Sequence, residues 1–352
     1  MQGENITGAN NATYERSSYE ILAPPLFAAI IVIGSIGNTL LIYAVLRWKE
    51  MRTPCNYLIV NNAVADLGVV FLAAPLGIVE VYHGWTLDEP ACRIIAPIQD
   101  VFVAVSVLTY TLISWERYRV VITPFKTKLT LRGIIIAAAV IWIIAYLGTG
   151  LPIALHLGLV KIQGKPYCSA SFASDLSRQM YETYLVVVFL VVPLTVQTLA
   201  YSRLLHRLAG RDPLERSLTD SKSSRTRRVK KRRLVRVTAF LVILFQICYI
   251  PRMVVMMLTE FAREVTNNAY FKYVDLVLMA LFYVKHVINP LVLFSISTDF
   301  RKRFPCRVHR NCLHNTRLRA FSSRRSTQTT KCTAENGHNG EEREIILRVS
   351  AV

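Results

Sequence analysis

The sequence predicts an all-α membrane protein, a bundle of seven transmembrane helices with a short amphipathic eighth helix. Apolar residues make up 53% of the 352 residues and charged residues only 18%, a balance unlike that of a soluble domain. A helix needs about 20 apolar residues to cross a bilayer. A buried soluble bundle would instead need polar stripes at helical spacing, and most of the apolar runs lack a wide polar face. The runs are 21–46, 57–82, 94–111 (continuing as a helix to 121), 134–155, 184–205, 234–258 and 273–294.

Basic residues gather on one side of the predicted membrane. Of the 42 Lys and Arg residues, 32 fall within 47–55, 119–133, 203–236 and 301–352, the segments after the first, third, fifth and seventh runs. Cytoplasmic segments of membrane proteins carry this excess of positive charge. The net charge of +19 therefore indicates orientation and contact with membrane lipids, and not nucleic-acid binding. We expect a multi-pass plasma-membrane protein with its N-terminus extracellular and its C-terminus cytoplasmic.

This topology divides the chain into three regions. Residues 1–20 form a polar extracellular tail with glycosylation sequons at Asn5 and Asn11. Because this tail has no apolar signal-peptide core, we expect the first run to act as an uncleaved signal. Residues 21–306 form the membrane domain, and 307–352 form a disordered cytoplasmic tail.

The seven cysteines divide by compartment. Cys92 and Cys168 fall on the outer side, where disulfides persist. Cys168 lies in a loop, 157–172, that reads as two β-prone pieces around a turn at 164–166. A bridge between these two cysteines would hold the hairpin over the third run. Cys306 and Cys312 follow a short basic amphipathic segment and are candidates for palmitoylation, with unmodified thiols as the alternative.

The third run ends in the charged triplet Glu116-Arg117-Tyr118, and Arg117 follows Cys92 by 25 residues. One helix thus carries a cysteine at its outer end and an acid–arginine pair at its inner end. This combination indicates a protein in which a conformational change passes from the outside to the cytosol.

Further motifs occur in a fixed order along the runs, and together they give a family resemblance. Over about 21–306 the chain resembles the rhodopsin-like (class A) G-protein-coupled receptors, and among them the neuropeptide-type receptors. The matching positions are Gly37-Asn38, Ala63 to Asp66, Trp85, Cys92, Glu116-Arg117-Tyr118, Pro124, Trp142, Pro193, Tyr201, Phe245, Cys248, Pro251, Asn289-Pro290 and Phe300.

The resemblance implies an activation switch that runs through the bundle. A guanidinium offers several fixed donors, so Arg117 can pair with Glu116 in the silent receptor and then change partners to Tyr201 and the G protein. Prolines free backbone carbonyls and permit helix bending. The expected switch residues are Asp66, Glu116, Arg117, Tyr118, Tyr201, Phe245, Tyr249, Pro251, Lys285, Asn289 and Pro290.

Several positions depart from the family pattern. Leu293 stands where a tyrosine is usual, Tyr249 where a tryptophan is usual, and Lys231 where some relatives have an acid that cross-links to the arginine. Lys285 and His286 replace the small or amide side chains that help Asp66 and Ser106 hold a sodium ion. Because an ionised group in mid-membrane needs a partner, we expect Lys285 to replace sodium as the partner of Asp66. The alternative is that Lys285 points to backbone carbonyls or internal water.

The ligand-facing residues favour a peptide over a small amine. Amine receptors carry an aspartate where this chain has Gln99, and Asp100 is rotated by about 100° around the helix. Tyr283 stands where a retinal-binding lysine would be needed. Arg252 is placed to bind a carboxylate or a peptide carbonyl, whereas Glu80, Glu182 and Asp275 could take basic groups. The expected ligand contacts are Gln99, Asp100, Arg252, Tyr283, Met279 and Glu80; an amine or lipid ligand is the alternative.

The cytoplasmic segments indicate regulatory partners. Serines and threonines within 217–224 and 322–330 suit receptor kinases and then arrestin. The terminus Ser350-Ala351-Val352 matches a ligand for PDZ domains. We expect no catalytic constellation, metal or cofactor, and hence no enzyme. A membrane transporter is the rival class, but the sequence shows neither internal repeats nor interrupted helices.

Overall fold

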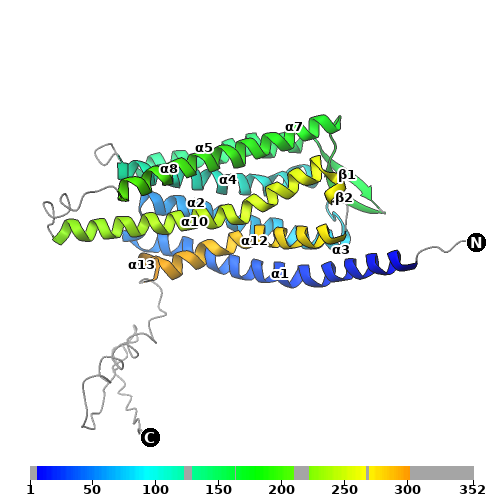
Figure 1. The fold of residues 1–352 in the computed structure, drawn as a ribbon, viewed down its shortest axis with the longest axis horizontal. Helices are drawn as coiled ribbons and strands as arrows, with labels where there is room; N and C mark the ends of the chain where they lie inside the picture. Colours follow the sequence, from blue (N-terminus) through cyan, green and yellow to red (C-terminus); the bar gives the residue numbers. More distant parts are fainter. Residues whose placement is uncertain (1–5, 123–128, 163, 210–221, 267–268, 302–352) are drawn as a thin grey trace, which may run out of the picture. The chain divides into compact units, whose positions relative to one another are not determined.

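The computed structural model describes residues 6–122, 129–162, 164–209, 222–266 and 269–301 (Figure 1). Within them, seven helical stretches are long and apolar enough to cross a membrane. They confirm the seven predicted runs. They are Pro24–Arg47, Pro54–Glu80, Glu89–Ile122, Leu131–Ala154, Asp175–Arg207, Arg232–Phe261 and Tyr273–Ile296.

The helices run back and forth side by side (Figure 1). α4 is central, because it packs against α2, α5, α8 and α10, and α12 packs against α1 and α10. The first helix begins at Ile6, well before the first apolar run. The bounds are α1 Ile6–Arg47, α2 Pro54–Gly68, α3 Ala74–His83, α4 Glu89–Ile122, α5 Leu131–Ala145, α6 Leu151–Ala154, α7 Asp175–Val186, α8 Val192–Ala209, α10 Lys222–Phe261, α11 Arg263–Thr266 and α12 Ala269–Ile296.

Three spans contain a widened π-helical turn, at Val69–Ala73, Tyr146–Gly150 and Val187–Val191. Each turn lies just before a proline: Pro75, Pro152 or Pro193. A proline lacks the N–H that would bond the carbonyl four residues earlier, and its ring crowds that carbonyl. The turn that holds this carbonyl therefore opens by one residue, and the span continues beyond it without a break.

Hydroxyl caps define several helix starts. Thr53 accepts from the backbone N–H of Asn56 at the start of α2, and Thr130 accepts from Gly133 at the start of α5. Ser174 and Ser177 cap α7 reciprocally. These bonds satisfy N–H groups that have no partner within the helix.

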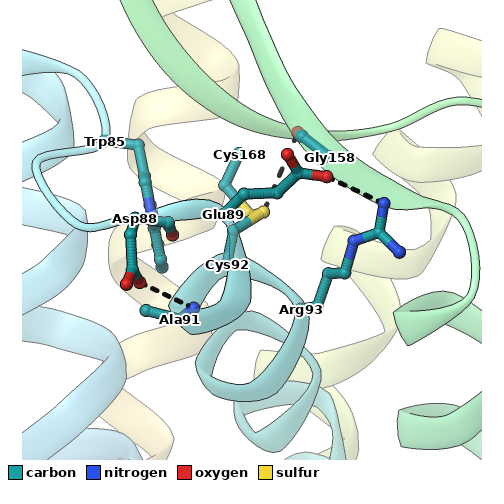
Figure 2. Close-up of a disulfide and its surroundings, with 8 residues drawn as sticks. All are labelled: Trp85, Asp88, Glu89, Ala91, Cys92, Arg93, Gly158 and Cys168. Carbon is teal, nitrogen blue, oxygen red and sulfur yellow. Dashed lines mark hydrogen bonds and ion pairs between the residues drawn. A yellow bond between two sulfur atoms is a disulfide. The ribbon is translucent and has the colours of Figure 1, made fainter.

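The predicted outer hairpin is present as β1, Leu157–Ile162, and β2, Lys165–Ala170, paired antiparallel. Gly164 turns the chain with a positive φ of 82°. The disulfide between Cys92 and Cys168 joins β2 to the start of α4 and confirms the predicted bridge (Figure 2). Trp85 donates its backbone N–H to Pro166 O at 2.6 Å. A Cβ on neighbouring Gly84 would lie 2.3 Å from that same oxygen, so the close approach requires glycine.

The eighth helix is described only as one turn, α13, Thr298–Arg301. Phe300 is buried there and contacts Phe294 edge to face, with ring centroids 5.7 Å apart. The predicted amphipathic continuation of this helix, with Cys306 and Cys312, lies outside the described residues, as do Asn5, Pro124 and the tail serines and threonines. The side chains of Asn11 and Lys231 also lie outside them.

Candidate functional site

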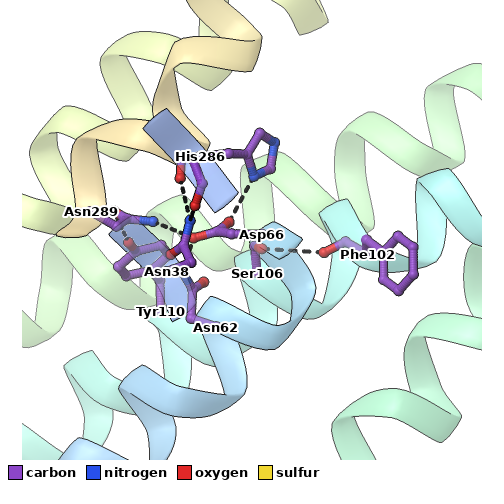
Figure 3. A network of polar contacts seen from close by, with 9 residues as sticks. Asn38, Asn62, Asp66, Phe102, Ser106, Tyr110, His286 and Asn289 are labelled. Atoms are coloured by element: carbon purple, nitrogen blue, oxygen red, sulfur yellow. Dashed lines mark hydrogen bonds and ion pairs between the residues drawn. The ribbon is translucent and has the colours of Figure 1, made fainter. Parts of the chain in front are cut away.

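A buried polar network surrounds Asp66 in the middle of the bundle (Figure 3). Asp66 Oδ1 lies 2.7 Å from Nδ1 of His286, and Oδ2 accepts from the amides of Asn62 at 2.8 Å and Asn289 at 2.7 Å. Asp66 is only 1% exposed. Since a buried carboxylate is costly unless it is hydrogen-bonded or paired, these three partners explain how α2 holds an acid at this depth.

The network extends to the first and third spans. Asn38 of α1 donates to the backbone carbonyl of His286 at 2.8 Å. Tyr110 of α4 donates its hydroxyl to Asn289 Oδ1 at 2.5 Å. His286 and Asn289 are three residues apart on α12, so they lie on one face of that helix. Four spans therefore meet around one carboxylate.

The prediction that Lys285 pairs with Asp66 is wrong, because His286 takes that position. The Lys285 ammonium has no hydrogen-bond partner among the described residues and lies over the rings of three aromatic residues. Its Nζ is 4.2 Å from the ring centroid of Phe282, 4.8 Å from Phe245 and 4.9 Å from Tyr249. Consecutive residues of a helix point about 100° apart. Position 286 therefore faces α2, while position 285 faces α10, where cation–π attraction stabilises the buried charge.

These residues do not fit a sodium ion. The imidazole of His286 lies against Asp66 Oδ1, and both amides occupy Oδ2. Ser106, the second expected sodium ligand, donates to the Phe102 carbonyl of its own helix at 3.2 Å (Figure 3). Both oxygens of Asp66, the group that would carry the negative charge at a cation site, are thus engaged by partners within the chain.

At the inner end of α4, Glu116 and Arg117 are both buried but do not pair with each other. Arg117 Nε and Nη2 and Glu116 Oε2 have no hydrogen-bond partner among the described residues. Adjacent side chains on a helix do not face each other, which explains why the predicted ion pair is absent in this structure. Tyr201 of α8, the expected later partner, is also buried, and its hydroxyl has no partner in the described part of the chain.

The sequence reasoning missed a second polar link, which joins the third, fifth and sixth spans. Gln197 of α8 donates to Thr111 Oγ1 at 2.9 Å and accepts from Gln246 of α10 at 2.7 Å. The signal was present, since a glutamine in a membrane run needs a partner. Only the packing of the helices shows which partner each glutamine finds.

The expected ligand-facing residues lie in the outer halves of four spans. Gln99 and Asp100 are on α4, Glu80 is on α3 and Arg252 is on α10. Met279 and Tyr283 of α12 pack against the buried cluster of Phe27, Ala74 and Leu276. Arg252 already has a partner, because its Nη1 lies 2.6 Å from Asp275 Oδ1 on α12.

A second ion pair crosses the outer ends of the fifth and sixth spans. Arg178 Nε of α7 lies 2.9 Å from Glu260 Oε1 of α10. With the Arg252–Asp275 pair, it ties α10 to both neighbouring helices. The outer half therefore neutralises these charges between helices, whereas Asp100 and Glu182 make no ion pair with any described residue.

Residues 37–293 match the model of the seven-transmembrane receptor family, rhodopsin type. The chain belongs to this family. It is therefore a multi-pass plasma-membrane receptor that signals through a heterotrimeric G protein, and not an enzyme.

Characterised relatives extend this family match. The QRFP-like peptide receptor of Branchiostoma floridae is 27% identical over 299 residues, covering 81% of this chain and 77% of the relative. The human neuropeptide FF receptor 1 is 27% identical over 322 residues, covering 85% and 74%. The substance-K receptor of Canis lupus familiaris is 28% identical over 287 residues, covering 79% and 73%.

Proposed function

We propose that this rhodopsin-family receptor binds an extracellular peptide with a basic group and activates a cytosolic G protein in response. The characterised relatives are named as receptors for neuropeptides, among them RF-amide peptides. Their agreement on peptide ligands supports a peptide over the alternatives of a small amine or a lipid.

Two carboxylates that form no ion pair with any described residue carry the proposal. Asp100 of α4 is exposed although it lies within a membrane-spanning helix, and Glu182 of α7 has a buried oxygen without a hydrogen-bond partner among the described residues. The two carboxylates are near enough to repel each other, and Arg178 offsets only part of this repulsion at Glu182. Charged groups in spans face the bundle interior or a water-filled cavity. A guanidinium or ammonium group of a ligand would relieve this repulsion.

The remaining charges at the outer ends of the helices also favour a basic group on the ligand over an acidic one. Arg252 is held by Asp275 and Arg178 by Glu260, so a ligand carboxylate would have to compete for either arginine. The Cys92–Cys168 disulfide holds the hairpin at this end of the bundle. We assign Gln99, Met279, Tyr283 and Glu80 to the same ligand-facing region, as the sequence predicts.

The cytosolic partners complete the proposal. With the N-terminus outside, the basic segments face the cytosol, and Arg117, whose Nε and Nη2 have no hydrogen-bond partner among the described residues, serves the G protein. Kinases and arrestin would use the serines and threonines of the loop and tail, and a PDZ domain would use the terminus at 350–352. Glycosylation at Asn5 and Asn11 and palmitoylation at Cys306 and Cys312 remain predictions, as do the region boundaries at 20 and 306.

The test compares a synthetic peptide ending in Arg-Phe-amide with its citrulline analogue, which lacks the positive charge. Cells would express the full chain with a promiscuous G-protein reporter. Asp100→Asn and Glu182→Gln should each raise the half-maximal concentration of the arginine peptide about 10- to 100-fold, as expected for a charged hydrogen bond of about 1.5–3 kcal/mol.

The control variant is Glu89→Gln, which removes an exposed carboxylate at the outer end of α4 that pairs with Arg93 at 2.8 Å. It should leave the half-maximal concentration unchanged. Equal potency of the two peptides on the wild-type receptor would contradict the basic-group assignment. In a parallel library screen, a response to amines or lipids alone would contradict the peptide assignment, and ion-coupled uptake without signalling would favour a transporter.

A further inference from the structure

Tyr110 joins three spans at the inner side of the Asp66 network, although the sequence pattern gave no reason to select it. It lies on α4 and is 3% exposed. Its hydroxyl reaches α12 and its ring reaches α10. A change in the position of either helix relative to α4 must therefore disturb Tyr110.

The hydroxyl provides the link to α12. It donates to Asn289 Oδ1 at 2.5 Å, while Asn289 Nδ2 donates to Asp66 Oδ2 at 2.7 Å. Asn289 itself is 7% exposed. In a membrane interior no bulk water replaces a lost bond, so separating α12 from α4 here would leave a buried phenol and a buried amide oxygen without partners.

The ring provides the link to α10. Its centroid is 4.7 Å from that of Phe245, and Phe245 in turn lies beneath the Lys285 ammonium of α12 at 4.8 Å. Aromatic pairs at this distance attract each other beyond the effect of burial alone. Outward movement of α10 would separate Phe245 from both Tyr110 and Lys285.

The other ties expected at the inner half of the bundle are missing from the described residues. Arg117 and Glu116 do not pair, and Leu293 has no hydroxyl. Leu293 and Tyr110 line one small cavity together with Asn289, Thr238 and Leu241. In the family pattern, a tyrosine of the seventh span stands at the position of Leu293. Here the phenol of Tyr110, on the third span, lies next to Asn289 in the cavity that Leu293 also lines.

We propose that Tyr110 is the positioning residue that restrains this receptor in the absence of ligand. Its hydroxyl holds α12 against α4 through Asn289, and its ring holds α10 through Phe245. The restraint does not depend on the nature of the ligand.

The test is the substitution Tyr110→Phe, which removes one oxygen and keeps the ring. At matched surface expression, ligand-free signalling through a promiscuous G-protein reporter should rise at least about threefold, the factor expected for loss of a bond worth about 0.7 kcal/mol. Unchanged or lower ligand-free signalling would overturn the proposal.

Tyr181→Phe is the matched control. The Tyr181 hydroxyl also bonds between two spans, to the backbone carbonyl of Thr149 at 3.3 Å, but it contacts neither Asn289 nor Phe245. It should leave ligand-free signalling unchanged. An equal rise in both variants would overturn the assignment, because it would show general loosening of the bundle.

Two further comparisons test whether Tyr110 acts through its bond to Asn289 on another helix or only by filling space in the bundle. Exchanging the side chains, Tyr110→Leu with Leu293→Tyr, keeps their summed volume but places the phenol on the same helix as Asn289. Ligand-free signalling should stay raised, and a return to the wild-type level would overturn the proposal. Tyr110→Phe should also add little to Asn289→Ala, whereas full additivity would show that the two residues act independently.

A second measurement needs neither ligand nor G protein. A fluorophore on Arg236→Cys, an exposed position of α10, would report the surroundings of its inner end in the purified full chain with Cys306, Cys312 and Cys332 changed to serine. Tyr110→Phe should shift the emission and Tyr181→Phe should not. An unchanged spectrum for Tyr110→Phe would overturn the restraint even if the reporter does not couple to this receptor.

Discussion

Asp66 and Arg117 are both buried charges in the same bundle, yet their surroundings differ completely. Asp66 has three partners on two helices, and both of its oxygens are used. Arg117 is 8% exposed, and its Nε and Nη2 have no partner in the described part of the chain. Since a buried charge is costly until it is paired, the Asp66 carboxylate is satisfied within the bundle, and the inner end keeps donors available for a partner from the cytosol.

The largest expected effect is at Arg117, at the inner end of α4. Arg117→Ala should lower the maximal G-protein response more than about tenfold, because it removes the hydrogen-bond donors that the G protein would use. Surface expression should be retained, since no bond within the described chain is lost. Arg132→Ala, an exposed arginine at the start of α5, should signal normally. A normal response from Arg117→Ala would show that the free donors serve no partner.

A second test examines the Asp66 site. Because His286 and two amides occupy Asp66, the thermal midpoint of the purified receptor should be the same in sodium chloride as in potassium chloride. A bound ion would instead stabilise the folded state by mass action, by about 0.4 kcal/mol even at a concentration equal to its Kd.

His286→Ser should free Asp66 Oδ1 and introduce sodium-dependent stabilisation. Lys285→Met provides the control, because Lys285 does not contact Asp66 and its loss should not create a sodium effect. A wild-type receptor stabilised by sodium would show that the His286–Asp66 contact gives way to the ion.

A smaller effect than at Arg117 is expected at Tyr201, whose buried hydroxyl has no hydrogen-bond partner among the described residues. Tyr201→Phe should lower the agonist response about three- to tenfold, because Leu293 cannot supply a second hydroxyl to Arg117. The same change in a relative with both tyrosines should have a weaker effect. A near-wild-type response here would count against a direct contact between Tyr201 and Arg117.

The residues that the sequence located correctly are those whose role depends on one helix or one covalent bond. The spans follow from apolar length, and the Cys92–Cys168 bridge follows from the shared outer compartment. The predictions that were wrong concern the direction in which a side chain points around its helix. Lys285 and His286 are neighbours in sequence, but only one of them reaches Asp66, and Glu116 does not face adjacent Arg117.

Pairings between spans were the least predictable. Nothing local to Tyr110, Gln197 or Gln246 specifies its partner, because each bond joins residues far apart in sequence. A polar side chain in an apolar run indicates that a partner must exist. The helix rotation and the neighbouring span decide which one it is.

The sequence by itself determined that this protein is a seven-span receptor with a disulfide-held outer hairpin, because hydrophobic length, charge asymmetry and motif spacing are properties of the chain. Only the tertiary structure decided which charges are paired. Bond formation in the bundle depends on distances of about 3 Å, and these arise only when the helices are packed. Asp66 is therefore held by His286, Lys285 by aromatic rings, and Arg117 by no described side chain.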